Sequence, residues 1–217
     1  MATKNYVSNK DESARLFQSG FLELFTHMHW STPLIVFVPV VTYFLYRAVW
    51  VHQINVSGIL GLFVLGVLVW TVTEYVLHRF VFHYQPTSTL GKRLHFLMHG
   101  VHHDYPNDSL RLVMAPVISI PLATGFYFLF LPVLGQASVA PFFAGFIFGY
   151  ICYDMIHYAT HHAPMKSPYA QWLKHHHMRH HYQTDSLGFG VSSPLWDYVF
   201  RTTFPQKAGG SQITDGQ

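Results

Sequence analysis

The sequence predicts an all-α integral membrane protein, with four transmembrane helices in two hairpins and a cytosolic helical cap holding a histidine-rich dimetal site. Three observations predict this fold class. Half of the 217 residues are hydrophobic and only 11% are charged, whereas a soluble domain carries about 25% charged residues. Four apolar runs approach the roughly 20 residues that a helix needs to cross a bilayer. Ten histidines fall in four short clusters beside these runs.

The chain starts with a polar segment, residues 1–31, which mixes both charges. It lacks the early apolar core of a secretory signal, so we expect it to be retained as a cytosolic or interfacial segment. Within it, Phe21–Trp30 (FLELFTHMHW) has the amphipathic pattern of a helix on a membrane surface. We interpret His27 and His29 as interfacial polar side chains.

Residues 32–204 are predicted to form the membrane domain, and residues 205–217 a disordered tail. The apolar runs cover Pro33–Trp50, Gly58–Leu77, Leu112–Leu134 and Ala137–Ile156. Short links at Val51–Ser57 and Gly135–Gln136 join them into two helical hairpins. Both chain ends then lie on one side of the membrane.

The basic residues predict the orientation. Twelve of the 13 Lys and Arg residues lie in the N-terminal segment, between the hairpins or in the tail, and only Arg47 lies on the opposite side. The positive-inside rule places the basic side in the cytosol. We therefore expect both termini and all four histidine clusters to be cytosolic.

Composition also excludes some classes of function. The net charge is only +3, and no basic block or nucleic-acid module is visible, so we expect no nucleic-acid partner. Cys152 is the single cysteine, which excludes an internal disulfide and a multi-thiolate metal site. An imidazole site remains open.

The four clusters predict metal binding. They are His78–His83 (HRFVFH), His99–His103 (HGVHH), His157–His161 (HYATH) and His177–His181 (HMRHH). Residues three and four apart share a helix face, so each histidine trio in the second and fourth clusters can present its imidazoles to one point. The five-residue spacing in the first cluster is looser and suits a helix end or an unwinding turn. One ion takes about four to six ligands, so ten imidazoles predict two ions.

The other histidines and the nearby carboxylates have supporting or surface roles in this interpretation. His52 is expected to be solvated. The histidines that neighbour the clusters are expected beside ligands or on the surface: His95, His162, His175 and His176. Glu74 and Asp154 lie within one turn of cluster histidines, where a carboxylate can accept a hydrogen bond from the distal nitrogen of a ligand.

The residues favour oxidation over hydrolysis. A zinc hydrolase usually has a general base such as the Glu of an HExxH helix, and this chain has no such motif. Iron with imidazole ligands activates dioxygen, and a site at the membrane surface suits oxidation of an acyl or isoprenoid chain. A metal transporter is disfavoured because no His, Asp or Glu lies near the middle of the apolar runs. A sequestering histidine tract would not require regular spacing.

Four local stretches resemble the fatty acid hydroxylase superfamily, membrane di-metal enzymes that include sterol desaturases and carotenoid hydroxylases. The stretches are Glu74–His83 (EYVLHRFVFH), His99–Pro116 (HGVHHDYPNDSLRLVMAP), Tyr153–His161 (YDMIHYATH) and His177–Tyr182 (HMRHHY), the last continuing to Gly188–Asp197 (GFGVSSPLWD). The pattern of Pro106, Asp108 and residues 111–113 after the second cluster is similar to that of the fatty acid 2-hydroxylase group.

The resemblance implies ten metal ligands: His78, His83, His99, His102, His103, His157, His161, His177, His180 and His181. It implies two iron ions, although family members can be isolated with zinc, and dioxygen as cosubstrate. The reaction would be 2-hydroxylation of a long acyl chain, free or in a sphingolipid amide. Tyr153 and Asp154 match a Tyr-Asp pair of the family and, with Glu74, are the candidate catalytic residues. Another sterol or carotenoid oxidation, a desaturation and a zinc-dependent lipid hydrolysis remain alternatives.

The resemblance also implies an electron donor. Eukaryotic relatives carry an N-terminal haem domain of cytochrome b5 type, and about 30 polar residues are too few for such a domain. We therefore expect a separate cytochrome b5-like or ferredoxin/reductase donor, and a bacterial inner membrane rather than the endoplasmic reticulum. A basic surface at Lys92, Arg93, Lys174 and Arg179 would suit an acidic carrier, or these charges only set the topology.

Overall fold

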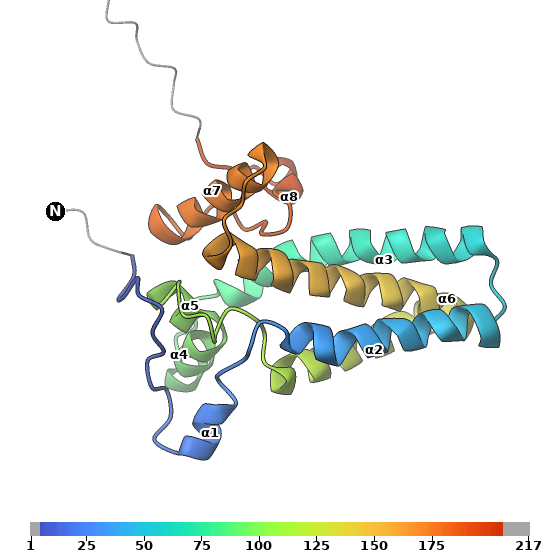
Figure 1. Ribbon diagram of the computed structural model, residues 1–217, viewed down its shortest axis with the longest axis horizontal. Coiled ribbons are helices and arrows are strands. Elements are labelled where there is room, and N and C mark those ends of the chain that lie inside the picture. Colours follow the sequence, from blue (N-terminus) through green and yellow to red (C-terminus); the bar gives the residue numbers. More distant parts are fainter. Residues whose placement is uncertain (1–4, 206–217) are drawn as a thin grey trace, which may run out of the picture.

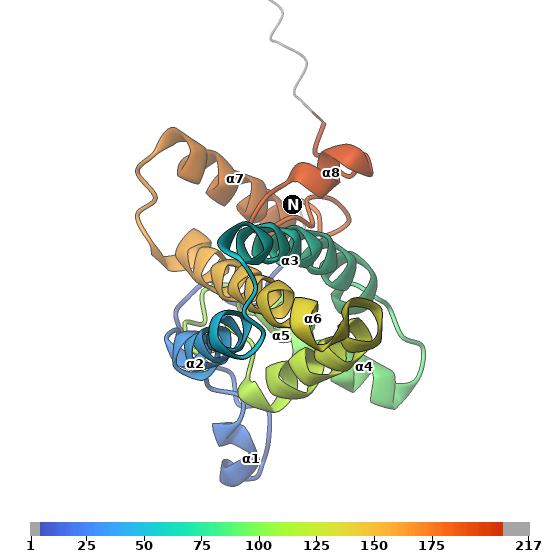
Figure 2. The same ribbon diagram turned by 90° about the vertical axis from the view of Figure 1, so that its right-hand side faces the viewer.

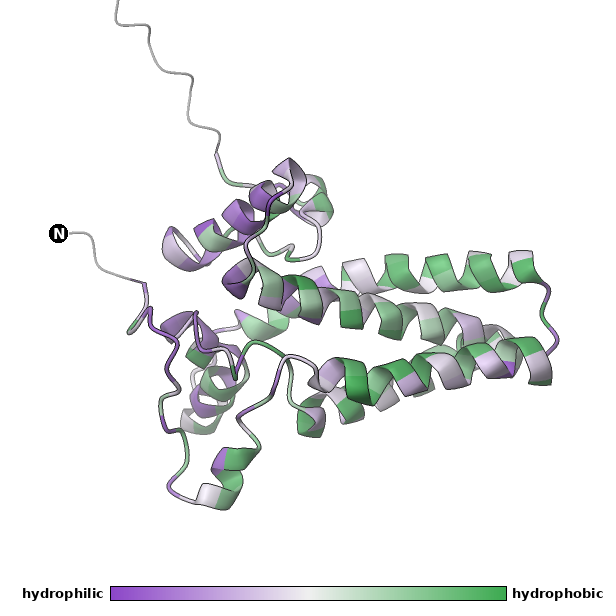
Figure 3. Cartoon of the chain, in the orientation of Figure 1, coloured by the Kyte–Doolittle hydropathy of each residue, from purple (hydrophilic) through white to green (hydrophobic). Residues whose placement is uncertain are grey.

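A computed structural model of the protein describes residues 5–205 and is helical in all its regular elements. Long apolar helices form a bundle, and shorter helices gather at one end of it as a cap (Figure 1). Three stretches are long and apolar enough to cross a membrane: Thr32–Val51, Val56–Phe82 and Pro116–His162. Figure 3 shows hydrophobic residues along the bundle and more hydrophilic ones in the cap.

The first two spans form a hairpin, as the sequence predicts. Helix α2 (Thr32–Tyr46) continues as the π-helical turn η1 (Arg47–Val51), and α3 (Val56–Val76) continues as η2 (Leu77–Phe82). The side chain of Asn55 caps α3 by accepting a hydrogen bond from the Gly58 N–H at 2.8 Å.

The third span, α6 (Pro116–His162), folds back on itself at Gly135. Gly135 has φ 73° and ψ 166°, a conformation that favours glycine. The rings of Phe126 and Phe146 lie 5.1 Å apart, and those of Phe130 and Phe142 lie 4.9 Å apart, so the two halves run antiparallel (Figures 1 and 2). The break lies at the predicted link.

Two predicted boundaries of this span were wrong. Its first half starts at Pro116 rather than Leu112, because proline suits the first helical turn and Leu112 and Val113 are buried outside the helix. Its second half continues past Ile156 to His162. The bundle helix itself therefore carries the third histidine cluster into the cap.

Glycines bring α3 and the second half of α6 into close contact. A Cβ atom on Gly145 would lie 2.0 Å from the Phe63 carbonyl oxygen, and one on Gly66 would lie 2.0 Å from that of Phe142. Small residues allow membrane helices to approach in this way. The site depends on this contact because α3 leads into the first histidine cluster and α6 carries the third.

The cap consists of short helices. They are α4 (Thr89–His95), η3 (Phe96–Gly100), α5 (Val101–Asp104), α7 (Pro168–Tyr182) and α8 (Leu195–Val199). The N-terminal segment lies against the cap, with the Met28 N–H donating to the Leu110 carbonyl at 2.7 Å. Within residues 5–31, the regular element of this segment is α1 (Gly20–Leu24). Nearly all of the predicted tail, residues 206–217, lies outside the described residues.

Replacing Gly145 with leucine is expected to disrupt the bundle. The new side chain would meet backbone rather than a movable side chain, so the cost should reach about 3 kcal/mol or more. Thermal unfolding in detergent measures the effect. Gly61→Leu on α3 is the control, because a Cβ atom there meets nothing within 4 Å. Equal melting temperatures of the two variants would contradict the proposed packing.

Candidate metal centre

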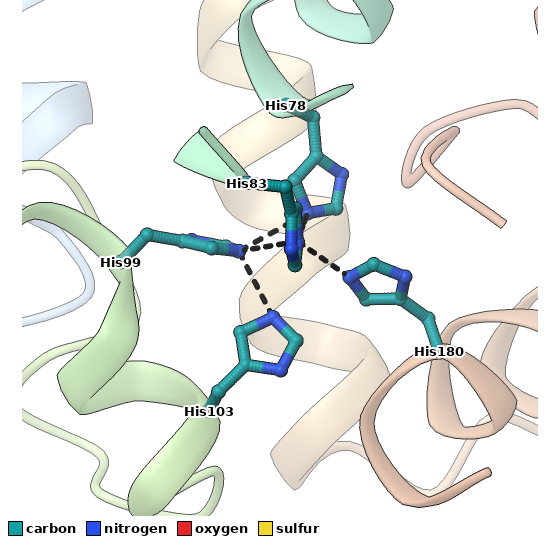
Figure 4. Close-up of side chains that lie close together, drawn as sticks. All are labelled: His78, His83, His99, His103 and His180. Carbon is teal, nitrogen blue, oxygen red and sulfur yellow. Dashed lines mark hydrogen bonds between the residues drawn. The ribbon is translucent and has the colours of Figure 1, made fainter. Parts of the chain in front are cut away.

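The histidines of the four sequence motifs gather in space into two groups, which we call the first and second clusters. Five rings converge in the first cluster. Its members are His78, His83, His99, His103 and His180. They come from η2, the residue after η2, η3, α5 and α7, and Figure 4 shows the rings pointing toward one another. Neighbouring Nε2 atoms lie 3.0 to 3.3 Å apart.

Five further histidines form a second, fully buried cluster. Its members are His102, His157, His161, His177 and His181. Three separations between Nε2 atoms define its centre: 2.9 Å for His102 and His157, 3.0 Å for His161 and His177, and 3.1 Å for His177 and His181. Residues from α5, α6 and α7 thus meet at one point.

The spacing fits a metal ion in each cluster. Two imidazole nitrogens about 2.1 Å from one ion lie about 3.0 Å apart at a right angle and about 3.4 Å apart at the tetrahedral angle. The observed Nε2 separations, 2.9 to 3.3 Å, are close to this range. Both groups contain histidine alone. Such a donor set suits iron, zinc or another first-row transition metal and does not suit magnesium or calcium.

The predicted convergence of each trio on one point was wrong. His99 and His103 belong to the first cluster, whereas His102 belongs to the second. On α7, His180 joins the first cluster, while His177 and His181 join the second. Successive residues of a helix point about 100° apart, so adjacent histidines reach different centres.

A π-helical turn explains the five-residue spacing of the first motif. The His83 N–H donates to the His78 carbonyl oxygen at 3.2 Å, which is the i to i+5 bond of a π-helix. This wider turn places residues five apart on one face, and the Nε2 atoms of His78 and His83 lie 3.3 Å apart. The unwinding turn predicted from the sequence is therefore η2.

Burial keeps four of the cap histidines in these clusters neutral: His83, His102, His177 and His180. It lowers the pKa of His83 and the pKa of His180 to about 3, and it lowers the pKa of His102 and that of His177 well below their usual value. At neutral pH each ring then has one N–H and one lone pair. The neutral imidazole binds a metal ion through this lone pair.

Two backbone carbonyls fix which nitrogen keeps the proton. His180 donates from Nδ1 to the Leu187 carbonyl at 2.8 Å, and His78 donates from Nδ1 to the Phe189 carbonyl at 2.5 Å. With the proton on Nδ1, each lone pair is on Nε2 and points into the first cluster. Hydrogen bonds of this kind orient metal-binding histidines.

The two carbonyls belong to the loop 187–193, which we call the positioning loop. The buried carboxylate of Asp197 accepts hydrogen bonds from the Phe189 N–H at 2.9 Å and the Gly190 N–H at 2.8 Å. His176 also binds it, with Nε2 3.1 Å from the carboxylate. Sequence reasoning did not assign a role to Asp197, although this residue ends the GFGVSSPLWD stretch.

Glu74 holds the next part of the same loop. Its carboxylate accepts from the N–H groups of Val191 and Ser192, both at 2.8 Å, and from the Ser192 hydroxyl. Glu74 was predicted to bind the distal nitrogen of a ligand. These contacts instead place it on the positioning loop, through which it acts on the ligands indirectly.

Tyr153 and Asp154 lie beside both clusters. Both are buried and line a cavity of about 60 Å³ together with His99, His102 and His157. The structure therefore brings the predicted Tyr-Asp pair to a small cavity that touches histidines of both clusters.

Two larger cavities reach the histidines. One of about 560 Å³ includes the polar side chains of Gln85, Asp104, Gln183 and Asp185 and touches both clusters, through His83 and His181 among others. The other, of about 400 Å³, is mostly apolar and ends at His102. The segment Phe96–Asp104, which we call the partition, separates the two cavities.

The partition presents different residues to each cavity. The residues on the polar side are Phe96, His99, Gly100, His103 and Asp104. Those on the apolar side are Leu97, Met98, Val101 and His102. One short stretch thus separates two environments and contributes ligands to both clusters.

The remaining predicted positions lie away from the centres or at their edge. His27 contacts Arg111, and His52 contacts Arg47. His95 lines the polar cavity, and His175 is exposed.

An apolar bundle capped by two five-histidine clusters defines a multi-pass membrane metalloprotein. The sequence matches the profile of fatty acid hydroxylases over residues 63–202. The chain belongs to the fatty acid hydroxylase family.

The relatives agree with this assignment. The chain is 39% identical to the rat (Rattus norvegicus) fatty acid 2-hydroxylase over 89% of its length, and spans 58% of that relative. It is 38% identical to a dihydroceramide fatty acyl 2-hydroxylase of Arabidopsis thaliana, covering 91% of this chain and 83% of the relative. The solved hydroxylase domain of full-length scs7p superposes with a TM-score of 0.82 at 40% identity, over 89% of this chain and 73% of that chain.

Removing one ligand is expected to empty one centre and spare the other. His78→Ala should lower the metal content from about two ions to about one per chain through the first cluster, and His181→Ala should do so through the second. Elemental mass spectrometry of purified protein measures the ratio. His175→Ala, at an exposed position on α7, is the control. Two retained ions in either ligand variant would refute its assignment.

Asp197→Asn is expected to weaken the first centre selectively. The amide is a poorer acceptor for two loop N–H groups, so His78 and His180 should lose orientation and metal affinity should fall about 10- to 100-fold. Competition with a chelator measures this affinity. Thr202→Val removes another hydrogen bond to the same carboxylate and leaves both loop N–H groups bound. An equal loss of affinity in both variants would reduce Asp197 to a general structural role.

Proposed function

We propose that the chain is a 2-hydroxylase of long acyl chains. The observation that carries the proposal is the apolar cavity, which leads toward a paired histidine centre and shares lining residues with the space beside Tyr153 and Asp154. Related proteins named fatty acid 2-hydroxylase and dihydroceramide fatty acyl 2-hydroxylase support an acyl substrate, free or amide-linked.

The proposed placement follows from the bundle. Helices α2 and α3 and the two halves of α6 cross the membrane four times, and the cap lies on the cytosolic side with most Lys and Arg residues. The exposed apolar residues of α1, among them Phe21 and Leu24, then rest at the membrane surface.

The proposed reaction inserts one oxygen atom into the C–H bond next to the acyl carbonyl. Two iron ions held by the ten histidines would supply the activation of dioxygen. One oxygen atom of dioxygen becomes the new hydroxyl group. The other leaves as water with two electrons and two protons, and the electrons come from a separate carrier protein.

The residues of the chain position the reactants. Tyr153 and Asp154 line the small cavity, where they hold the carbonyl end of the substrate beside the clusters. Asp197 and Glu74 act as positioning residues through the loop that fixes His78 and His180. The polar side chains of the larger cavity provide a route for protons, and the exposed Lys92 and Arg93 in the cap suit an acidic electron carrier.

Mass spectrometry of hydrolysed lipids from cells that express the protein tests the proposal. New 2-hydroxy fatty acids should form with the wild type and be absent with His99→Ala, which removes a ring of the first cluster. The assay is repeated with an added electron donor and reductase. Continued absence of product from protein that holds both ions would overturn the proposal.

A further inference from the structure

The apolar cavity has a wall built by the N-terminal segment. Leu16, Phe17, Leu22, Phe25 and Met28 line one side of the cavity. The other side is lined by three residues of the partition and by the chain that leads into α6: Leu97, Met98, Val101, Val113, Met114, Ala115, Val117 and Ile118. The N-terminal segment thus closes a space that the histidine helices alone leave open.

The cavity runs from an exposed apolar rim to a buried end at the metal centre. At the rim, the exposed fractions are 47% for Leu22, 44% for Phe25 and 60% for Val117. At the inner end, Val101 and His102 are each only 4% exposed. Val117 lies in the first turn of the membrane span α6, so the rim lies where a lipid chain can enter from the bilayer.

The inner end continues into the small cavity beside the Tyr-Asp pair. Both cavities are lined by Met98, His102, Arg111, Val113 and Met114. A chain whose reacting carbon lies at Tyr153 and Asp154 can therefore extend into the larger cavity.

An ion pair between Glu23 and Arg111, in addition to apolar contacts, holds the N-terminal segment against the cavity. Glu23 accepts a hydrogen bond from the Arg111 guanidinium at 2.8 Å, and its other oxygen accepts from the Leu16 and Phe17 N–H groups at 3.0 and 2.7 Å. Asp108 lies 3.3 Å from the same guanidinium. Arg111 is thus neutralised by two carboxylates, and the cavity suits an uncharged hydrocarbon better than an anionic group.

We propose that this cavity binds the methyl-end portion of the acyl chain and that the wall residues Leu22 and Phe25 determine which chain lengths are accepted. The inference rests on the proposed 2-hydroxylation, since it places the reacting carbon at the histidine clusters. One methylene group in a fitted apolar pocket changes discrimination about 10-fold or more. Modest changes at the wall should therefore alter the product profile.

Competition between saturated acyl chains of increasing length tests the wall. Leu22→Trp narrows the rim and should lower the ratio of longest to shortest hydroxylated product about 10-fold, whereas Phe25→Ala should raise it. Leu24→Trp and Phe21→Ala are matched controls on the same helix, because both residues are exposed and neither lines the cavity. Ratios in Leu22→Trp and Phe25→Ala that equal those of the controls would overturn the inference.

A binding measurement separates this inference from the proposed reaction. A fatty acid with a diazirine at its methyl end is photolysed with the full chain, and labelled peptides are mapped. We expect labels in residues 16–28 and 113–118, reduced by unlabelled fatty acid. Labels confined to the outer bundle surface would overturn the inference. Labels in the wall without hydroxylated product, even with a donor, would preserve the cavity assignment and refute the reaction.

Discussion

The whole cap is arranged around one requirement, which is that ten buried or half-buried imidazoles hold their lone pairs toward two small volumes. Burial lowers the pKa of His83 and the pKa of His180 to about 3 and so keeps both rings neutral. Neutrality alone leaves either nitrogen free to carry the proton. The carbonyls of Leu187 and Phe189 decide this for two ligands, and the carboxylates of Asp197 and Glu74 hold the loop that supplies these carbonyls.

The membrane bundle also helps to position the histidines. Helices α3 and α6 approach closely at Gly66 and Gly145, and each extends beyond its apolar run to carry histidines. At the end of α3, the π-turn η2 aligns His78 with His83. Irregular turns of this kind are frequent at functional sites, and here the turn supplies two ligands from six residues.

Composition and spacing were enough to predict the helical membrane class, the break at Gly135 and the histidines that converge. These features depend on local sequence: apolar length, one glycine and i, i+4 pairs. The division of the ten histidines between two clusters was mispredicted, because the direction in which His102 and His180 point depends on how three helices are placed around the centre. Asp197 escaped detection for a similar reason, since it lies in a short helix that is far in sequence from His78. The wall formed by Leu22 and Phe25 also depends on tertiary contacts.

The division of adjacent histidines has a consequence for the distance between the two centres. His102 and His103 serve different clusters, and so do His180 and His181. Their ring centroids lie 5.9 and 5.7 Å apart. The helical backbone at each pair therefore fixes the distance between the two sites. Among residues 5–205, no carboxylate belongs to either group. The polypeptide would consequently set the separation of two metal ions held in these clusters, and this separation should be nearly the same for iron as for zinc.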